Sequence, residues 1–310
     1  MAQPFQTASA ALTSVMDFPQ RGVGGDPRYR GNWGANFVET VLRWVGQQTP
    51  VRRVNEIFTG SGTTIDVGNR LGITVDGRDL NPMPRIGMGG WDAQTDFFDE
   101  GCDVLLCHPP YWRMIPYSGA VWGDRPDPRD LSRIPTWGDF VQAMNKILIH
   151  HYPTIRVGGY LGVLVGDVAY HGRLYSMQHD IAWIGRPIRQ IVKIQRNYSS
   201  LQTAYRGSFI PIEHEYLLLF QREDTYLQPV SFSVSRTIDL RQREAQTWRD
   251  VVYAALRARG GQSGLSDLYG EIEGHAKTRA NPNWQAKVRQ TLQINPDFAP
   301  LGGGQWKLAA

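Results

Sequence analysis

The apolar residues of this chain follow two patterns before residue 221. Between residues 36 and 48 they recur at spacings of three and four, which predicts an amphipathic helix that ends ahead of a Thr-Pro pair. Six short apolar runs then follow, at 54–58, 73–76, 103–107, 161–165, 191–195 and 215–220. The spans between them are long enough for helices, as at 64–71 and 139–151. Apolar strands joined by helical crossovers predict an α/β fold with a mostly parallel sheet.

The pattern changes after residue 220. A polar segment over 221–247 predicts a linker with at most one short strand. Three helical patterns come next, at 248–257, 266–274 and 283–293, followed by a triple glycine and a strand-like QWKLA. This order is similar to that of winged-helix domains. We therefore expect three parts: an irregular arm over 1–28, an α/β domain over 29–235 and a winged-helix-like domain over 240–310.

Composition and charge narrow the function classes. Hydrophobic residues make up 41% of the 310 residues, which predicts a folded core. The net charge is +4, and residues 236–310 hold 11 basic against 7 acidic residues, so the whole surplus lies in the tail, where a polyanionic partner fits. Two cysteines, without clustered histidines, predict no disulfide, no metal site and a cytoplasmic location. No secretion signal or membrane-spanning run is visible.

The first candidate site is the segment E-I-F-T-G-S-G-T-T at 56–64, which joins a predicted strand to a predicted helix. Gly60 and Gly62 permit a tight turn and close approach to a ligand, and Glu56 can accept a hydrogen bond. The next strand ends at Asp79, where doubly wound folds hold a ribose diol. Neither a P-loop nor G-x-G-x-x-G is present, so a ribose-bearing cofactor without a pyrophosphate fits better, although such turns also serve packing alone.

The second candidate site is the turn His108-Pro109-Pro110-Tyr111, which follows the apolar run 103–107. Two prolines fix the chain and leave carbonyl oxygens as acceptors beside an aromatic ring, which suits an amino group on a flat ring. A proline-rich loop that merely ends a strand is the alternative. Because ligands of open α/β sheets bind beyond the carboxyl ends of the strands, we expect this turn and the Gly-rich turn to lie together.

Together these segments resemble the DNA amino-methyltransferases. Residues 56–64 are similar to the D-P-F-x-G-S-G-T-T cofactor motif of that family and 108–111 to its [D/N/S]-P-P-[Y/F/W] catalytic motif. Weaker matches are G-R-D-L-N-P at 77–82, W-D-A at 91–93 and H-E-Y-L-L-L-F at 214–220, so the resemblance covers roughly residues 29–220. It implies a Rossmann-like methyltransferase fold with a mostly parallel seven-stranded sheet, followed by the winged-helix-like domain.

The resemblance implies methyl transfer from S-adenosylmethionine to the exocyclic amine of a base flipped out of double-stranded DNA, with adenine N6 slightly favoured over cytosine N4. It assigns catalysis to His108, Pro109, Pro110 and Tyr111, with Tyr111 stacking on the base. It assigns cofactor contacts to Glu56, Phe58, Gly60, Gly62, Thr63, Thr64, Asp79 and Asp92. His108 departs from the family motif, because a histidine accepts a hydrogen bond only when it is neutral and in the right tautomer.

The expected DNA contacts lie mainly in the tail, at Lys277, Arg279, Asn283, Lys287 and Arg289. Arg113 belongs to a second candidate surface, the arginine-rich loop 113–137, which we expect to become ordered on substrate binding, and 196–211 is a third. A homodimer and a cognate restriction endonuclease are further partners to consider. The tail could instead be a solvated face or a dimerisation module. The alternative functions are a non-catalytic DNA-binding protein that retains a degenerate methyltransferase fold, and an RNA base methyltransferase.

Overall fold

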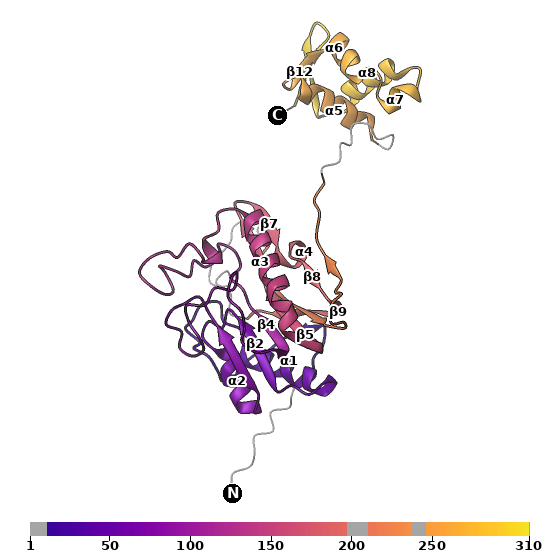
Figure 1. Cartoon of the computed structure of the whole chain (residues 1–310). Coiled ribbons are helices and arrows are strands. Elements are labelled where there is room, and N and C mark those ends of the chain that lie inside the picture. The colour runs from indigo at the N-terminus through magenta and orange to yellow at the C-terminus, as the bar shows by residue number, and fades with distance from the viewer. Residues whose placement is uncertain (1–10, 197–209, 237–245, 310) are drawn as a thin grey trace. The chain divides into compact units, whose positions relative to one another are not determined.

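The computed structural model describes residues 11–196, 210–236 and 246–309 (Figure 1). The chain divides into two compact units, Met1–Ser233 and Val234–Ala310, and each is described by itself.

Unit 1 is built on a seven-stranded sheet with the order β1-β9-β10-β5-β4-β2-β3. Its strands are β1 Val15–Met16, β2 Arg53–Ile57, β3 Thr74–Arg78, β4 Cys102–Cys107, β5 Ile155–Val165, β9 Arg186–Ile194 and β10 His214–Gln221. All neighbouring strands pair in parallel except those on either side of β10, which is antiparallel to both β5 and β9. The expected mostly parallel sheet is therefore present.

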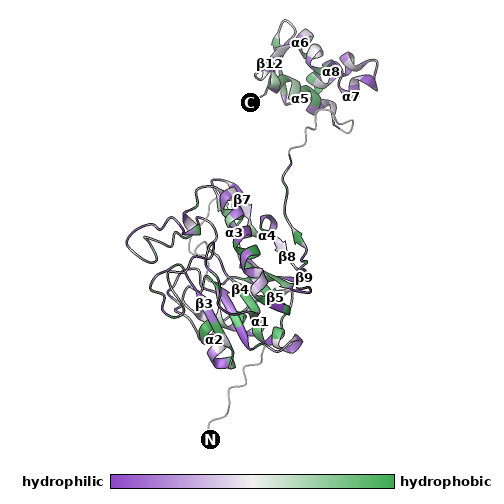
Figure 2. Ribbon diagram, viewed as in Figure 1, coloured by the Kyte–Doolittle hydropathy of each residue, from purple (hydrophilic) through white to green (hydrophobic). Residues whose placement is uncertain are grey.

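Helices cover both faces of this sheet. Successive residues of a strand point to opposite faces, so apolar side chains of the central strands contact helices on both sides. Helices α1 (Ala35–Gln48) and α2 (Thr63–Leu71) share a core with Val104 and Leu106 of β4. Helix α3 (Trp137–His151) shares a second core with the alternate β4 residues, Leu105 and Cys107. Figure 2 shows the apolar residues gathered on the central strands β4 and β5, between these helix layers. Two cores on opposite faces explain why the strand runs are apolar throughout.

The segment before α1 is more structured than the irregular arm that we expected. Val15–Met16 forms β1 and pairs in parallel with β9. The backbone N–H of Gly25 donates to Asp66 Oδ2 at 2.8 Å, and Arg21 Nη2 donates to Thr63 Oγ1 at 3.1 Å, both in α2. Long-range contacts of this kind leave no local sequence pattern, and they make the segment part of unit 1.

The loop over 113–137 is held by internal hydrogen bonds to one buried carboxylate. The buried Asp130 carboxylate accepts from the backbone N–H and hydroxyl of Ser118 (2.7 and 2.6 Å) and of Ser132 (2.8 and 2.7 Å). Arg133 donates to the carbonyl of Ser118. One carboxylate thus holds both ends of the loop. Shorter elements of unit 1 are the 3₁₀ turns Leu131–Arg133 and Tyr152–Thr154, β6 Asp167–Tyr170, β7 Arg173–Ser176, α4 Met177–Asp180, β8 Trp183–Ile184 and β11 Val230–Ser231.

Unit 2 has its own apolar core, formed by helices and a small antiparallel sheet of order β12-β14-β13. Its elements are α5 Trp248–Ala258, β12 Gln262–Gly264, α6 Leu265–Ile272, α7 Ala276–Arg279, α8 Trp284–Ile294, β13 Phe298–Gly302 and β14 Gln305–Leu308. The three expected helices correspond to α5, α6 and α8, whereas the short α7 and two of the three strands were not expected. The triple glycine, whose three residues all have positive φ, forms the turn between β13 and β14.

Among the described residues, no helix is long and apolar enough to cross a membrane. The same residues contain no group of three or more His, Cys, Asp or Glu side chains arranged to hold a metal ion. Cys102 and Cys107 are buried free thiols, and burial raises the pKa of Cys102 to about 12.

Candidate functional site

The candidate site residues lie along one edge of the sheet. Phe58, Asp79 and His108 directly follow β2, β3 and β4, whose carboxyl ends reach the same edge. Because β10 runs antiparallel, its first residues also lie there, and Glu215 is paired in register with Lys193 of β9. The topology thus brings five chemically active positions together, as expected for strand-end residues of an open α/β sheet.

The first cavity is the hollow beyond β2, β3 and β4, and it holds about 770 Å³ including space open to solvent. Seven of the predicted site residues line it: Phe58, Gly60, Thr63, Asp79, Asp92, His108 and Pro110. Residues that the sequence did not single out complete the wall, among them Tyr29, Asn32, Trp33, Tyr117 and Asp130. The Gly-rich turn and the Pro-Pro turn therefore border one cavity.

Asp79 ties the end of β3 to the Gly-rich turn. Its Oδ2 accepts from the N–H of Gly60 at 2.8 Å and its Oδ1 from the N–H of Asn81 at 2.8 Å. The carboxylate is almost fully buried, and this burial raises its pKa despite both hydrogen bonds. Each oxygen keeps one acceptor position, so the group can still receive two hydroxyl donors from a ligand.

Glu56 lies behind this wall and does not line the first cavity, as also holds for Gly62 and Thr64. Its carboxyl group accepts from the hydroxyls of Thr59 and Thr64, which are the flanks of the Gly-rich turn. Burial raises the pKa of Glu56 to about 8, with the two hydroxyls opposing that shift. The structure thus places Glu56 beneath the turn, where it braces the flanks of the turn; its predicted contact with a ligand stays a prediction.

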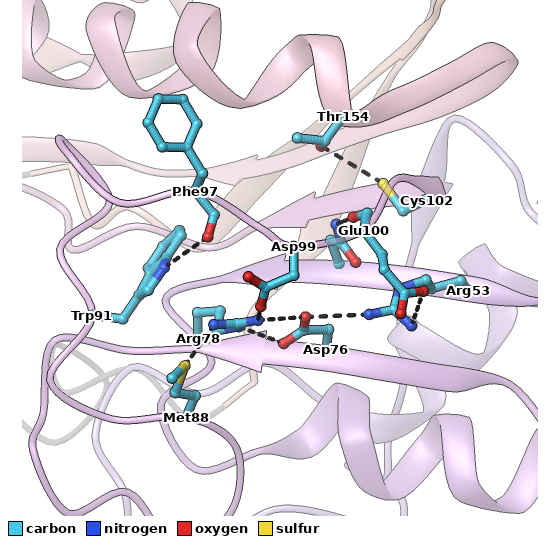
Figure 3. Close-up of polar contacts among 11 residues, drawn as sticks. Arg53, Asp76, Arg78, Met88, Trp91, Phe97, Asp99, Glu100, Cys102 and Thr154 are labelled. Carbon is cyan, nitrogen blue, oxygen red and sulfur yellow. Dashed lines mark hydrogen bonds and ion pairs between the residues drawn. The ribbon is translucent and has the colours of Figure 1, made fainter.

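Arg78 forms the neighbouring part of the wall and is held between two carboxylates, as Figure 3 shows. Its Nε donates to Asp76 Oδ1 at 2.6 Å and its Nη2 to Asp99 Oδ2 at 2.8 Å. Arg53 joins the same network, with its Nη2 at 3.4 Å from Asp76 Oδ2 and its Nη1 at 2.9 Å from Glu100 Oε2. The network connects β2, β3 and the segment before β4, so this end of the cavity is fixed.

A second cavity opens on the other side of His108 and holds about 1560 Å³ including space open to solvent. It shares five residues with the first cavity: Tyr29, Gly31, Asn32, His108 and Tyr117. Pro109, Tyr111, Lys193 and Glu215 line it as well. Arg30 contributes positive charge, whereas Arg196, also at this cavity, is paired with Asp17 (Nε to Oδ1, 2.6 Å). Two ligands could therefore meet at His108.

His108 is linked by hydrogen bonds to charged residues of β9 and β10. Its Nε2 lies 3.1 Å from the Tyr111 hydroxyl, which donates to Glu215 Oε1 at 2.9 Å. Lys193 Nζ donates to Glu215 Oε2 at 2.7 Å. Burial lowers the pKa of His108 to about 4. Burial alone would raise the pKa of Glu215, but the charge and hydrogen bond of Lys193, together with His108 and the Tyr111 hydroxyl, outweigh it and hold that pKa below its usual value.

The ring of Tyr111 is fixed against the backbone at Gly166. A Cβ at that position would lie 2.5 Å from Cε2 and 2.8 Å from Cδ2 of the ring, closer than real Cβ contacts. Tyr111 is also among the residues that line the second cavity. Its hydroxyl, which stacking leaves unused, is bonded to two neighbours.

Lys193 and Glu215 are the main site residues that sequence reasoning missed. A weak signal was present, because each interrupts an otherwise apolar strand, in I-V-K-I and in H-E-Y-L-L-L-F. A charge inside a buried strand needs a partner, and the partner here is the other strand's charge. Trp33 was missed too; its ring lies 5.4 Å from that of His108.

The predicted DNA-contact residues fall on two units. In unit 2, Lys277 and Arg279 belong to α7, while Lys287 and Arg289 belong to α8. Asn283 precedes α8, and the side chains of Arg279, Asn283 and Arg289 are exposed. In unit 1, Arg113 is exposed, with its guanidinium 5.8 Å from the ring centre of Tyr170. Most of the candidate surface at 196–211 lies outside the described residues.

Comparison with known proteins finds no matching family model and no matching curated protein. Among solved structures, the amino pentose methyltransferase CalS10 from Micromonospora echinaspora matches at 15% identity and TM-score 0.30, over 53% of this chain and 62% of CalS10. The N-methyltransferase NodS from Bradyrhizobium japonicum matches at 11% identity and TM-score 0.36, over 61% of this chain and 86% of NodS. A SAM dependent methyltransferase from Archaeoglobus fulgidus matches at 10% identity and TM-score 0.32, over 62% and 96%.

Proposed function

We propose that this protein transfers a methyl group from S-adenosylmethionine to the exocyclic amine of a base in double-stranded DNA. The observation that carries the proposal is the position of His108, which lines two adjoining cavities. One cavity has a Gly-rich turn and a buried acid, and the other has an aromatic ring and positive charge. Adenine N6 is the target that we favour over cytosine N4.

The residues of the first cavity fit the proposed cofactor. Asp79 has an acceptor position left on each oxygen, which suits the two hydroxyls of a ribose. Gly60 has a positive φ of 51°, and a Cβ there would meet the Tyr29 ring at 3.1 Å, so the turn keeps space that a side chain would take. Asp92 and Trp91 line the same cavity and offer an acceptor and a flat apolar surface to an adenine ring.

The chemistry requires positioning more than acid or base strength. When bound, S-adenosylmethionine supplies an electrophilic methyl group. An exocyclic amine is a weak nucleophile because its lone pair is delocalised into the ring. A neutral His108 nitrogen and the Pro109 carbonyl can accept its N–H bonds, which favours a pyramidal nitrogen and gives the released proton an acceptor. Tyr111 offers a ring on which the flipped base can stack.

Charge and element order support DNA as the substrate. Arg30 is an exposed cation at the second cavity, where a phosphate would follow an inserted base. In unit 2, three main helices are followed by the β-hairpin β13–β14, an order that supports a winged-helix module. Its exposed Arg279, Asn283 and Arg289 combine phosphate-binding charge with an amide that can contact a base edge.

The decisive test is methyl transfer by the full chain from a methyl-labelled cofactor to duplex DNA, followed by sequencing that detects modified bases. We expect label in DNA at N6 of adenine within one short sequence. Faster labelling of RNA would replace the proposal by an RNA methyltransferase. DNA binding without any labelling would replace it by a non-catalytic DNA-binding protein.

The role of unit 2 is tested by replacing Lys277, Arg279, Lys287 and Arg289 with Ala in the full chain. Each lost phosphate contact should make the dependence of log affinity on log salt shallower by about 0.9. Arg257→Ala, which removes an exposed cation of α5, is the matched control. An unchanged salt dependence in the fourfold variant would assign unit 2 another role.

A further inference from the structure

We propose that Glu215, acting through the Tyr111 hydroxyl, holds the proton of the His108 ring on Nε2 and so keeps Nδ1 as a hydrogen-bond acceptor. Glu215, Lys193 and the Tyr111 hydroxyl are then positioning groups for His108. Only the catalytic meaning of the inference rests on the proposed function. The proton position itself is a property of the protein alone.

The direction of each hydrogen bond follows from the donor and acceptor capacity of the groups. An ionised carboxylate can only accept, so the hydroxyl of Tyr111 gives its single hydrogen to Glu215 at 2.9 Å. The same oxygen can then serve His108 only as an acceptor, across 3.1 Å to Nε2. Nε2 must therefore carry the proton, and in a neutral imidazole this leaves Nδ1 unprotonated.

The series of hydrogen bonds from Glu215 through Tyr111 to His108 starts from a charged carboxylate, because Lys193 is fixed beside Glu215. The two residues face each other in the register of β9 and β10, and their charged atoms lie 2.7 Å apart. Lys193 Nζ also lies 5.9 Å from the ring centre of Phe37, which is fully buried in α1. A buried ion pair with this geometry keeps Glu215 an acceptor, and the lowered pKa of Glu215 agrees with that.

The rings of Tyr111 and His108 are held in place by their neighbours. The ring of Tyr111 lies against the backbone at Gly166, and two prolines precede it in the sequence. The ring of His108 lies 5.4 Å from that of Trp33, with 32° between their planes. Within the described part of the chain, Nδ1 of His108 makes no hydrogen bond. It thus keeps an unused hydrogen-bonding position.

The test is nitrogen NMR of the full-length protein with ¹⁵N-labelled histidine at neutral pH. The chain has 7 histidines, so a spectrum of His108→Asn identifies the signals of His108 by their loss. We expect Nε2 to appear protonated and Nδ1 unprotonated. A ring protonated on Nδ1, or on both nitrogens, in the parent protein would overturn the inference without any variant having to fold.

Tyr111→Phe tests the link to Glu215, because it removes the hydroxyl and leaves the Lys193–Glu215 pair in place. The tautomer ratio of His108 should shift toward Nδ1–H by about 2- to 10-fold, the range that one neutral hydrogen bond supports. Tyr216→Phe is the matched control, since it breaks a similar pair, in which the Tyr216 hydroxyl lies 2.6 Å from His214 Nε2, outside both cavities. An unchanged ratio in Tyr111→Phe would overturn the inference.

Activity separates this inference from the proposed function. If the parent has the expected tautomer but methylates no nucleic acid, the proposed function fails and the positioning chain stands. If the parent methylates DNA with a ring protonated on Nδ1, the positioning chain fails and the proposed function stands.

Discussion

Two buried glutamates of the same sheet edge, Glu56 beside the first cavity and Glu215 at the second, show opposite electrostatics. Burial raises the pKa of Glu56 to about 8, and its neighbours are the hydroxyls of Thr59 and Thr64. The pKa of Glu215 is instead below its usual value, because Lys193 faces it. Equal burial therefore leads to a carboxyl group that holds its proton on one side and to a carboxylate that holds its charge on the other.

The difference shows what each cavity can offer a ligand. The region around Glu56 is braced by hydrogen bonds from two hydroxyls, which suits the ligand binding through Asp79 and backbone groups that we propose for the first cavity. The region around Glu215 has a fixed charge whose effect reaches His108 through Tyr111. We therefore expect binding to depend on the first cavity and the chemical step on the second.

The largest expected effect is that of His108→Ala. Loss of the acceptor should lower the rate of methyl transfer by about 10²- to 10⁴-fold, the usual contribution of a positioned proton acceptor. Cofactor affinity should change little, since Asp79 and the Gly-rich turn are intact. Single-turnover transfer to DNA measures the rate, and His108→Asn, which keeps an acceptor oxygen, should retain part of it. A His108→Ala protein as fast as the parent would place the acceptor elsewhere.

The next effect is on cofactor affinity. Asp79→Ala should weaken binding by about 1–3 kcal/mol, because hydrogen bonds to a charged group are lost and Gly60 loses its partner. Calorimetry with S-adenosylmethionine measures this. Arg196→Ala, at the second cavity, should leave affinity unchanged. Equal affinities in all three proteins would contradict the assignment of binding to the first cavity.

Another effect concerns stability and pH. Because the pKa of Glu56 is about 8 in the folded protein against 4.5 ordinarily, its contribution to stability is full below about pH 4.5 and is lost as pH rises toward 8, by at most about 1.4 kcal/mol per pH unit. Glu56→Gln should flatten this part of the profile of unfolding free energy, measured in urea. Glu39→Gln, on the surface of α1, is the control. Identical parent and Glu56→Gln profiles would mean that Glu56 is ionised when folded.

The smallest expected effect is that of mild acid on the rate of methyl transfer, which should hardly change down to about pH 5.5. At about pH 5.5 an unperturbed imidazole is largely protonated, whereas a pKa of about 4 keeps His108 neutral. Methyl transfer should therefore keep most of its neutral-pH rate there and fall only near pH 4. Glu215, Lys193 and Tyr111 are the titratable groups that face this ring. An acid limb centred near pH 6.5, absent from His108→Asn, would show that burial does not protect the ring.

The first cavity was largely predictable from the sequence, because its chemistry lies on turns that directly follow strands. Gly60, Asp79 and His108 each come from a local motif, and parallel pairing brings such motifs to one edge. The sheet and three of the helices of unit 2 were predictable for the same reason, since their periodic patterns are local. The burial of Glu56 was not predictable, because a position in a motif does not show how deeply the side chain lies.

Of the second cavity, only the turn His108–Tyr111 was predictable, because the other parts are distant from it in sequence. Lys193 and Glu215 meet only through the register of an antiparallel pair, and a shift of one residue would separate them. The hydrogen bonds that the buried Asp130 makes within the loop at 113–137 were not predictable either, because no periodicity reveals them.

The close contact between Gly166 and the Tyr111 ring restricts which residues can occupy these two positions. Any side chain there would push into the ring of Tyr111, and the movement would break the hydrogen bonds that the hydroxyl makes on both sides. Positions 111 and 166 should therefore change together among relatives of this protein. A relative with alanine or a larger residue at 166 should carry a smaller residue at 111 and would need another means of orienting its histidine.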